Sequence, residues 1–380
     1  MTFLVDLATG TLMRSTRRSH TLTGLATLVL AAGIVLPANA QSRGNDGRPL
    51  DRELVSATRP LSTEQQGQVK AFAATQLEAL ADGDAEDLIA ARDALIQDAR
   101  RPGVTGVFLR AFSSELVPGI EKVLQQQGDG MQTMRAENGL RILAFLRTPE
   151  ALELIVATTN PNDVKDKSRR LVAAGLVPIA VEAVPQSGLG SAVLTSTARR
   201  LSENLVDDSD WIVVLEDLRA MNAIALNRIL TDENRSEVRD MQFNAYARLA
   251  NGIASSDAPS PIVKAIYRAM LGLRERLADN STAGDISTRQ IATTLQEMLK
   301  RIGSAAVRQW DGLEANPDMF EAYEGTLRVG AQLFSLLEGR PNAKINALAA
   351  PMAAVTVNGS TRESYNQALA GLKAALKNLG

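Results

Sequence analysis

The chain lacks cysteine altogether, contains a single histidine, His20, and has few aromatic residues, at 4%. Without cysteine, the protein can form no disulfide, no thiolate metal site and no lipid-modified N-terminal cysteine. Its fold must therefore be stabilised by an apolar core, and 380 residues are enough to bury one. The aromatic residues do not alternate with basic clusters, which argues against a stacking platform for nucleic acid.

The histidine lies in a segment with the features of an export signal. Three arginines within residues 14–18 precede an apolar run over residues 22–36, and Ala38 and Ala40 supply the small residues of a cleavage site. The run is shorter than the roughly 20 residues that a membrane-spanning helix needs. We therefore expect a signal peptide over residues 1–40, cleavage after Ala40, no stable membrane span afterwards, and a periplasmic or secreted protein.

Two details of this signal stay open. Residues 1–12 carry an acid, Asp6, and apolar residues where a signal needs positive charge, so a start at Met13 fits better. The paired Arg17 and Arg18 leave a twin-arginine signal as an alternative to ordinary secretion.

Loss of residues 1–40 would remove three arginines, one aspartate and the histidine, leaving a net charge of −4. A chain with neither histidine nor cysteine cannot build a Ser-His-Asp or Cys-His catalytic centre, an imidazole or thiolate zinc site, or a His- or Cys-ligated haem. Its slight negative charge gives no electrostatic footprint for nucleic acid. We expect a non-catalytic protein with no cofactor, no metal and no nucleic-acid partner.

Residues 41–61 are polar and contain several glycines and prolines, which predicts a flexible leader. A capping box of Ser62 and Gln65 should begin the folded part. From there apolar residues recur at helical spacing, without the alternation of strands. Further helices are expected at about 84–100, 104–127, 131–146, 149–158, 161–184 with a break at Gly175 or Pro178, 190–206, 209–229, 233–255, 259–278, 285–308, 317–338, 343–355 and 361–378.

This pattern predicts one all-α domain over residues 62–380, with about 13–14 helices joined by short turns. Such a domain can be a stacked α-solenoid or an irregular helical bundle.

The stretch 134–220 bears on that choice. Units that open with Arg135-Ala136, with Arg170 to Ala173 and with Arg200-Leu201 are separated by 35 and 30 residues, which suits a helix-pair repeat. With "TPEAL" at 148–152 and "AAGL" at 173–176, this stretch resembles HEAT-repeat proteins, especially their bacterial short-repeat branch. The resemblance implies a curved stack whose concave face binds a protein or a polymer.

Two acidic motifs invite a metal-binding interpretation. In "DGDAED" at 82–87, acids alternate as in a calcium loop, but Asp87 replaces the glycine of an EF-hand and Asp93 replaces its final glutamate. A turn between helices, with acids at the next N-terminus, explains the motif better. The same holds for "DDSD" at 207–210, where Ser209 or Asp210 would cap the following helix.

Two further motifs partly match a nucleotide-binding loop and a catalytic glutamate. "GLGSAV" at 188–193 lacks the third glycine of a dinucleotide loop and is interpreted as a helix connection. Glu137 precedes Asn138-Gly139-Leu140, whereas the superhelical lytic transglycosylases, which cleave glycans with carboxylates, place a serine after the glutamate. Glu137 therefore suits a solvated helix face between Arg135 and Arg141.

The chain has two tryptophans and many more arginines than lysines. Trp211 and Trp310 are expected to be core anchors near helix ends. Arginine outnumbers lysine, 32 to 9. Guanidinium groups could bind carboxylates or glycan acids, although codon usage in a GC-rich genome explains the same ratio.

These observations predict an exported, non-catalytic helical-repeat protein that binds a protein or polymer partner in the cell envelope. One alternative is a carboxylate-dependent, glycan-active enzyme similar to the lytic transglycosylases. The other is a structural component of the envelope.

Overall fold

The computed structural model of the chain describes residues 49–126, 128, 130–278 and 288–338, together with positions 370 and 374. Helices fill most of these ranges and no strand occurs in them, which confirms the all-α class. The expected signal peptide lies outside the described residues, as do the expected helices at 343–355 and, apart from two positions, 361–378. Among the described helices, none is both long and apolar enough to cross a membrane.

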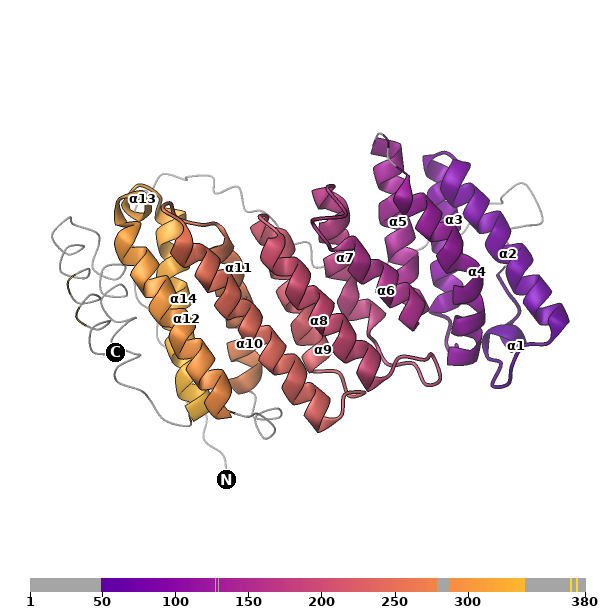
Figure 1. The fold of residues 1–380 in the computed structure, drawn as a ribbon. Coiled ribbons are helices and arrows are strands. Elements are labelled where there is room, and N and C mark those ends of the chain that lie inside the picture. Colours follow the sequence, from indigo (N-terminus) through magenta and orange to yellow (C-terminus); the bar gives the residue numbers. More distant parts are fainter. Residues whose placement is uncertain are drawn as a thin grey trace, which may run out of the picture. The chain divides into compact units, whose positions relative to one another are not determined.

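Fourteen helices make up the described ranges (Figure 1). In chain order they are α1 (Arg52–Val55), α2 (Thr63–Asp82), α3 (Ala85–Ala99), α4 (Gly106–Gln125), α5 (Gly130–Leu146), α6 (Pro149–Thr158), α7 (Lys167–Ala180), α8 (Ser191–Asp207), α9 (Trp211–Ala225), α10 (Asp232–Ser255), α11 (Ile262–Ala278), α12 (Thr288–Arg308), α13 (Trp310–Glu314) and α14 (Pro317–Glu338).

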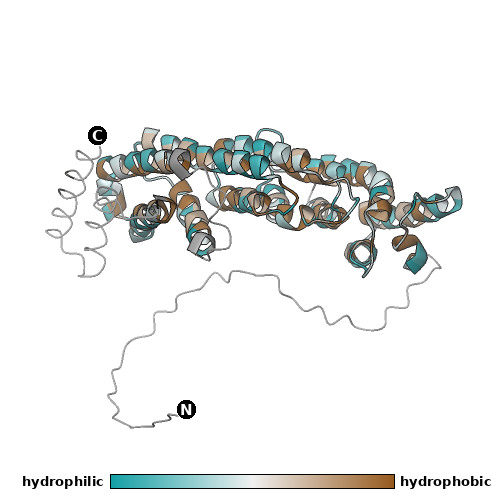
Figure 2. Ribbon diagram, turned by 90° about the horizontal axis from the view of Figure 1, so that it is seen from below, coloured by the Kyte–Doolittle hydropathy of each residue, from teal (hydrophilic) through white to brown (hydrophobic). Residues whose placement is uncertain are grey.

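From α2 onward the helices alternate between two layers. The first layer contains α2, α4, α6, α8, α10 and α12, and the second contains α3, α5, α7, α9, α11 and α14. Each helix packs against the next one of its own layer, and each helix of the first layer also packs against the helix of the second layer that follows it. Figure 2 shows the layers as two rows of helices, each with hydrophobic and hydrophilic stretches. Because each helix pair buries its apolar face against neighbouring pairs, the fold is a helical-repeat, solenoid-like stack.

The core between the layers is made of apolar side chains at helical spacing. Phe108 and Phe112 of α4 are fully buried, with ring centroids 5.1 Å apart, and Phe72 of α2 lies 6.2 Å from Phe112. Leu140 of α5 is also fully buried. Burial of such side chains stabilises each by about 1.5–3 kcal/mol and holds the layers together.

Polar side chains join successive pairs at the ends of the helices. The last carbonyls of a helix have no partner within it. Arg135 of α5 donates a hydrogen bond to the carbonyl of Gly83, the residue after α2 (3.0 Å). Arg169 of α7 donates to the carbonyl of Leu124 in α4 (3.1 Å). Gln309, which follows α12, donates to the carbonyl of Ile253 in α10 (3.1 Å). Two of these three side chains are arginines, so arginine helps to connect successive helix pairs.

Most helix boundaries fall within a few residues of those expected, and the capping box of Ser62 with Gln65 is present. The helix expected at 161–184 is shorter, because Asp166 caps it and accepts hydrogen bonds from the N–H groups of Ser168 (2.9 Å) and Arg169 (3.3 Å). It also runs without a break through Gly175 and Pro178. Pro178 lies in its last turn, so the helix loses the hydrogen bond to the carbonyl of Ala174 and continues for only two more residues.

The packed structure begins earlier than the predicted leader allows. Leu50 is buried, and its N–H donates to the buried carboxylate of Asp98 (3.1 Å). Arg101 bonds both to Asp98 and to the carbonyl of Leu50. Leu54 and Val55 of α1 are buried as well. A helix of four residues is too short to show a period in the sequence, so only its tertiary contacts reveal it.

The three arginine-led units at 134–220 are not equivalent in the structure. Arg135 and Arg170 lie in α5 and α7, which are successive helices of the second layer. Arg200 lies in α8 of the first layer. The 35-residue spacing therefore follows the stack, whereas the 30-residue spacing crosses from one layer to the other.

Gly330 of α14 marks a close approach to α12. A Cβ atom there would lie 2.3 Å from Cδ2 of Leu299, which is fully buried. We expect Gly330→Ala to lower the free energy of unfolding by about 1–3 kcal/mol, because either the buried Leu299 side chain must leave its position or the two helices must separate. Gly272→Ala in α11 is the control, since no atom lies within 4 Å of its Cβ position. Equal effects of the two substitutions in urea unfolding would contradict the packing.

Candidate binding site

The first layer contains one helix that is much shorter than its neighbours. α6 has 10 residues, whereas α4 has 20 and α8 has 17. Pro149 at its first position favours the start of the helix, and Pro161 disfavours helical conformation at Asn160 just after its end. At 1.5 Å per residue, α6 is about 15 Å long beside about 30 Å for α4. Hollows are left on both of its sides.

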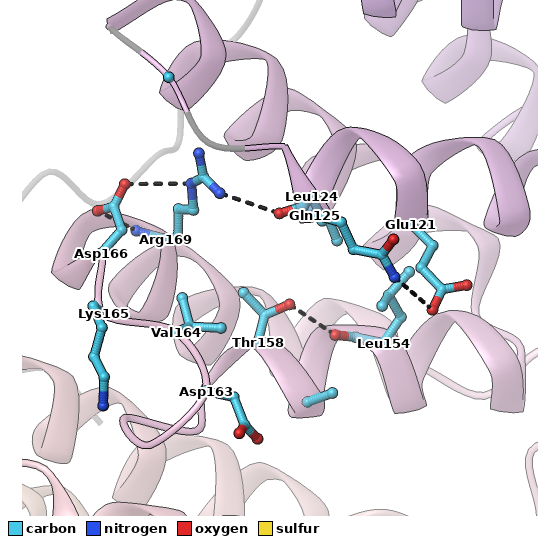
Figure 3. Close-up of a pocket in the computed structure, with 12 residues that line it drawn as sticks. Glu121, Leu124, Gln125, Leu154, Thr158, Asp163, Val164, Lys165, Asp166 and Arg169 are labelled. Atoms are coloured by element: carbon cyan, nitrogen blue, oxygen red, sulfur yellow. Dashed lines mark hydrogen bonds and ion pairs between the residues drawn. The ribbon is translucent and has the colours of Figure 1, made fainter.

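The larger hollow is a cavity of about 660 Å³ between α4, α6 and the start of α7 (Figure 3). Its apolar lining comes from Leu124 of α4, Leu154 and Ala157 of α6, and Val164 of the α6–α7 loop. The polar lining residues are Glu121, Gln125, Thr158, Asp163, Lys165, Asp166 and Arg169.

The cations at this cavity are held by partners within the chain. The guanidinium of Arg169 donates to the carbonyls of Leu124 (3.1 Å) and Gln126 (3.3 Å), and its Nε lies 3.3 Å from an oxygen of Asp166. The Nζ of Lys165 donates to the carbonyl of Pro161 (2.9 Å). Because Arg169 is buried and has three such partners, its guanidinium is held in place at the cavity.

Two carboxylates at the cavity keep most of their acceptor capacity with respect to the described residues. Glu121 accepts one hydrogen bond from Gln125 (3.4 Å), and Asp163 accepts one from Asn160 (2.6 Å). Both acids are exposed, and an ionised carboxylate can accept about four hydrogen bonds. The cavity therefore offers apolar contact together with two anionic acceptors.

The smaller hollow, of about 340 Å³, lies between α6 and α8. Pro149 and Val156 of α6 and Val193 of α8 provide apolar lining, and Glu153 and Arg200 form an ion pair (3.4 Å) among the residues around it. A segment that crosses α6 could place one side chain in each hollow.

None of the acidic motifs singled out in the sequence lines these hollows. Asp84 caps α3 and accepts hydrogen bonds from the N–H groups of Glu86 (2.8 Å) and Asp87 (3.0 Å), so the motif at 82–87 is a turn between helices, as expected. Asp210 rather than Ser209 caps α9. Across the described ranges, no group of three or more carboxylates is arranged to hold a metal ion.

The remaining candidates also have structural roles. The segment 188–193 connects helices, with Gly188 at φ +94° and α8 beginning at Ser191, as predicted. Glu137 is half-buried on α5 and forms an ion pair with Arg141 (3.4 Å). Trp310 is buried, as predicted for a core anchor. Trp211 packs against the core but is only partly buried, and the Arg268 guanidinium lies 4.9 Å from its ring centroid, so the prediction for this residue holds only in part.

Sequence reasoning missed the cavity because its lining comes from two helices, a loop and the start of a third helix. Leu154 and Ala157 have the spacing of ordinary core positions, and Asp163 belongs to a polar turn. The signal that could have found it is the length of the helix at 149–158, which is short beside the helices predicted around it.

No protein-family model matches the chain, and no curated protein is significantly similar to it. A solved crystal structure of an engineered protein is similar with 17% sequence identity over 86% of this chain and 85% of that chain, at a TM-score of 0.30. This similarity is too low to support an argument, so the solenoid-like class follows from the helix contacts alone.

Proposed function

We propose that the chain is an exported, HEAT-like helical-repeat protein that binds a protein or polymer partner in the cell envelope and does not catalyse a reaction. The observation that carries this proposal is the cavity beside the short helix α6. Helical-repeat proteins bind through the surface formed by successive repeats. A shortened helix in one layer creates a recess in such a surface.

The geometry of the cavity supports binding by a pre-organised surface. Arg169 is buried and donates to two backbone carbonyls, so its side chain needs little further ordering on association. The apolar lining can bury an apolar side chain of a partner, and Glu121 and Asp163 can accept hydrogen bonds from it. Export is supported by the arginines, the apolar run and the Ala38-Asn39-Ala40 site of the leader.

Filling the cavity tests the binding proposal. We expect Ala157→Phe to abolish capture of the partner by the immobilised chain from an envelope extract, because the ring would occupy the space beside Leu154. Ala74→Phe is the matched control, since Ala74 is exposed on α2 and does not line the cavity. Circular dichroism melting should give similar curves for both variants. Capture that is equal for the two variants would reject the cavity as the site.

Two further measurements separate the alternatives. Co-sedimentation with purified peptidoglycan sacculi that is lost in Ala157→Phe would identify a polymer as the partner. Cleavage of the sacculi that is lost in Glu137→Gln would favour the glycan-active enzyme instead. If the chain binds neither proteins nor sacculi, the structural role is favoured. A mass corresponding to residues 41–380 for the protein recovered from its native cell envelope is the expected result for export.

A further inference from the structure

A second feature of the molecule lies in the other layer, where Trp211 begins α9 and two cations of α11 face its ring. The Lys264 Nζ lies 6.0 Å and the Arg268 Cζ 4.9 Å from the ring centroid. The two cations are four residues apart, so they lie on the same face of α11. Trp211 and Lys264 are partly exposed and Arg268 is exposed. We call these three residues the Trp211 cluster.

The cations of the Trp211 cluster differ in their partners from several exposed cations that pair with acids. Arg199 pairs with Glu237 (2.8 Å), Arg219 with Glu216 (2.5 Å), and Lys167 with Asp210. Neither Lys264 nor Arg268 forms an ion pair within the described part of the chain, and the ring of Trp211 is their observed partner.

Asp210, the acid closest in sequence to this cluster, already has other partners. Asp210 precedes Trp211, accepts hydrogen bonds from the N–H groups of Ile212 (3.0 Å) and Val213 (3.4 Å), and pairs with Lys167. Partial burial raises the pKa of Asp210, but the hydrogen bond from Lys167 and those from the backbone outweigh it, so the net pKa lies below the ordinary value. Asp210 is therefore ionised at neutral pH and is committed to Lys167 and the cap of α9.

We infer that the Trp211 cluster is a docking surface for an acidic segment of a protein partner. An arginine fork binds a carboxylate through two parallel hydrogen bonds, and the lysine adds a second positive charge. The exposed part of the indole ring provides apolar contact for a neighbouring side chain, as tryptophan does at the centres of protein interfaces.

A short acidic segment fits better than a long polyanion. The whole chain has a net charge of −2, which repels an extended polyanion, whereas two local cations still attract a few carboxylates. Nucleic-acid binders typically neutralise about six to ten phosphates, far more than this cluster offers. The surface lies in the second layer and does not share a residue with the cavity beside α6.

Tryptophan fluorescence gives a direct test, because the chain has two tryptophans and Trp310 is buried edge-on against Phe320 at 5.9 Å. A Trp310→Phe variant leaves Trp211 as the reporter. We expect a six-residue peptide of five glutamates and one leucine to change the emission of this variant in a saturable manner. The affinity should fall at least tenfold when Lys264→Gln and Arg268→Gln are combined, and it should weaken with added salt. Titration calorimetry on the unsubstituted chain should give the same affinity.

Arg100→Gln is the matched control, because the Arg100 guanidinium lies 5.1 Å from the ring of Phe145 and is remote from Trp211 in the layer. It should leave the affinity unchanged. The inference fails if the peptide causes no change by either method, or if the double variant binds equally well. It also fails if polyphosphate or anionic lipid vesicles bind more tightly than the peptide. Because the cavity variant Ala157→Phe should not affect this titration, the two proposals can fail separately.

Discussion

Replacing Arg170 by alanine is expected to lower the free energy of unfolding by about 3–5 kcal/mol, the usual cost of leaving one member of a buried ion pair alone. Arg170 of α7 donates to both carboxylate oxygens of Asp208 (2.7 and 3.3 Å) and to the carbonyls of Val164 (2.8 Å) and Lys165 (3.0 Å). The side chain of Asp208 is 1% exposed, so water cannot replace the lost partner. The substitution would therefore weaken the connection between α7 and the α8–α9 turn.

Urea unfolding of the purified chain measures this effect, and Arg199→Ala is the matched control. Arg199 also pairs with an acid, Glu237, at 2.8 Å, but both side chains are about half exposed, at 58% and 42%. Such surface pairs contribute about 0–1 kcal/mol. A loss for Arg170→Ala that is no larger than the loss for Arg199→Ala would show that the pair is not buried in solution.

Replacing Asp217 by asparagine is expected to raise the free energy of unfolding at pH 7 by about 1–3 kcal/mol, because the amide, unlike the carboxyl group, does not have to take up a proton to be buried without charge. Asp217 of α9 is fully buried, and neither carboxylate oxygen has a hydrogen-bond partner among the described residues. Burial, together with the charges of Asp208 and Glu216, raises the pKa of Asp217 well above its ordinary value, against the attraction of Arg170. An asparagine side chain at this position would have nearly the same shape but would not ionise.

The sign of the pH dependence follows from that shift. Because the pKa of Asp217 is higher in the folded state, the folded state holds a proton that the unfolded state has released. Stability is therefore greatest below the ordinary pKa, near pH 4, and falls as the pH rises toward the raised pKa. The slope is about 1.4 kcal/mol per pH unit for one proton.

Urea unfolding from pH 4 to pH 8 tests this assignment. The advantage of Asp217→Asn over the unsubstituted chain should be small at pH 4 and should grow with pH. Asp93→Asn is the control, because the side chain of Asp93 is about half exposed, at 48%, and pairs with the neighbouring Arg92. A difference between Asp217→Asn and the parent that stays constant over this range would mean that Asp217 does not change its proton occupancy on folding.

The environments of Asp208 and Asp217 could not be predicted from the sequence. Asp208 belongs to a motif that the sequence singled out, but its partner Arg170 is 38 positions away and stood out only as the opening of a repeat unit. Asp217 lies in a run with the helical spacing of a surface acid, between Glu216 and Leu218. Its burial results from the packing of α9 among α7, α8, α10 and α11, which no local pattern specifies.

The candidate site was predicted even less well. The ends of α6 were predicted correctly, because Thr148-Pro149 and Asn160-Pro161 are local signals. Whether neighbouring helices close over a short helix depends on how they pack. The cavity is therefore a property of the stack and was found only in the structure.

The sequence by itself determined the all-α class, most of the helix ends and the capping role of Ser62, and it limited the cap of α9 to Ser209 or Asp210, because helix period and capping act over a few residues. Three features became clear only from the tertiary structure: the helices form a solenoid-like stack and not a bundle, the chain is packed from Leu50 onward, and Trp211 is partly exposed. These outcomes depend on contacts between residues that are tens of positions apart. Amphipathic helices of the same pattern can satisfy such contacts in more than one arrangement.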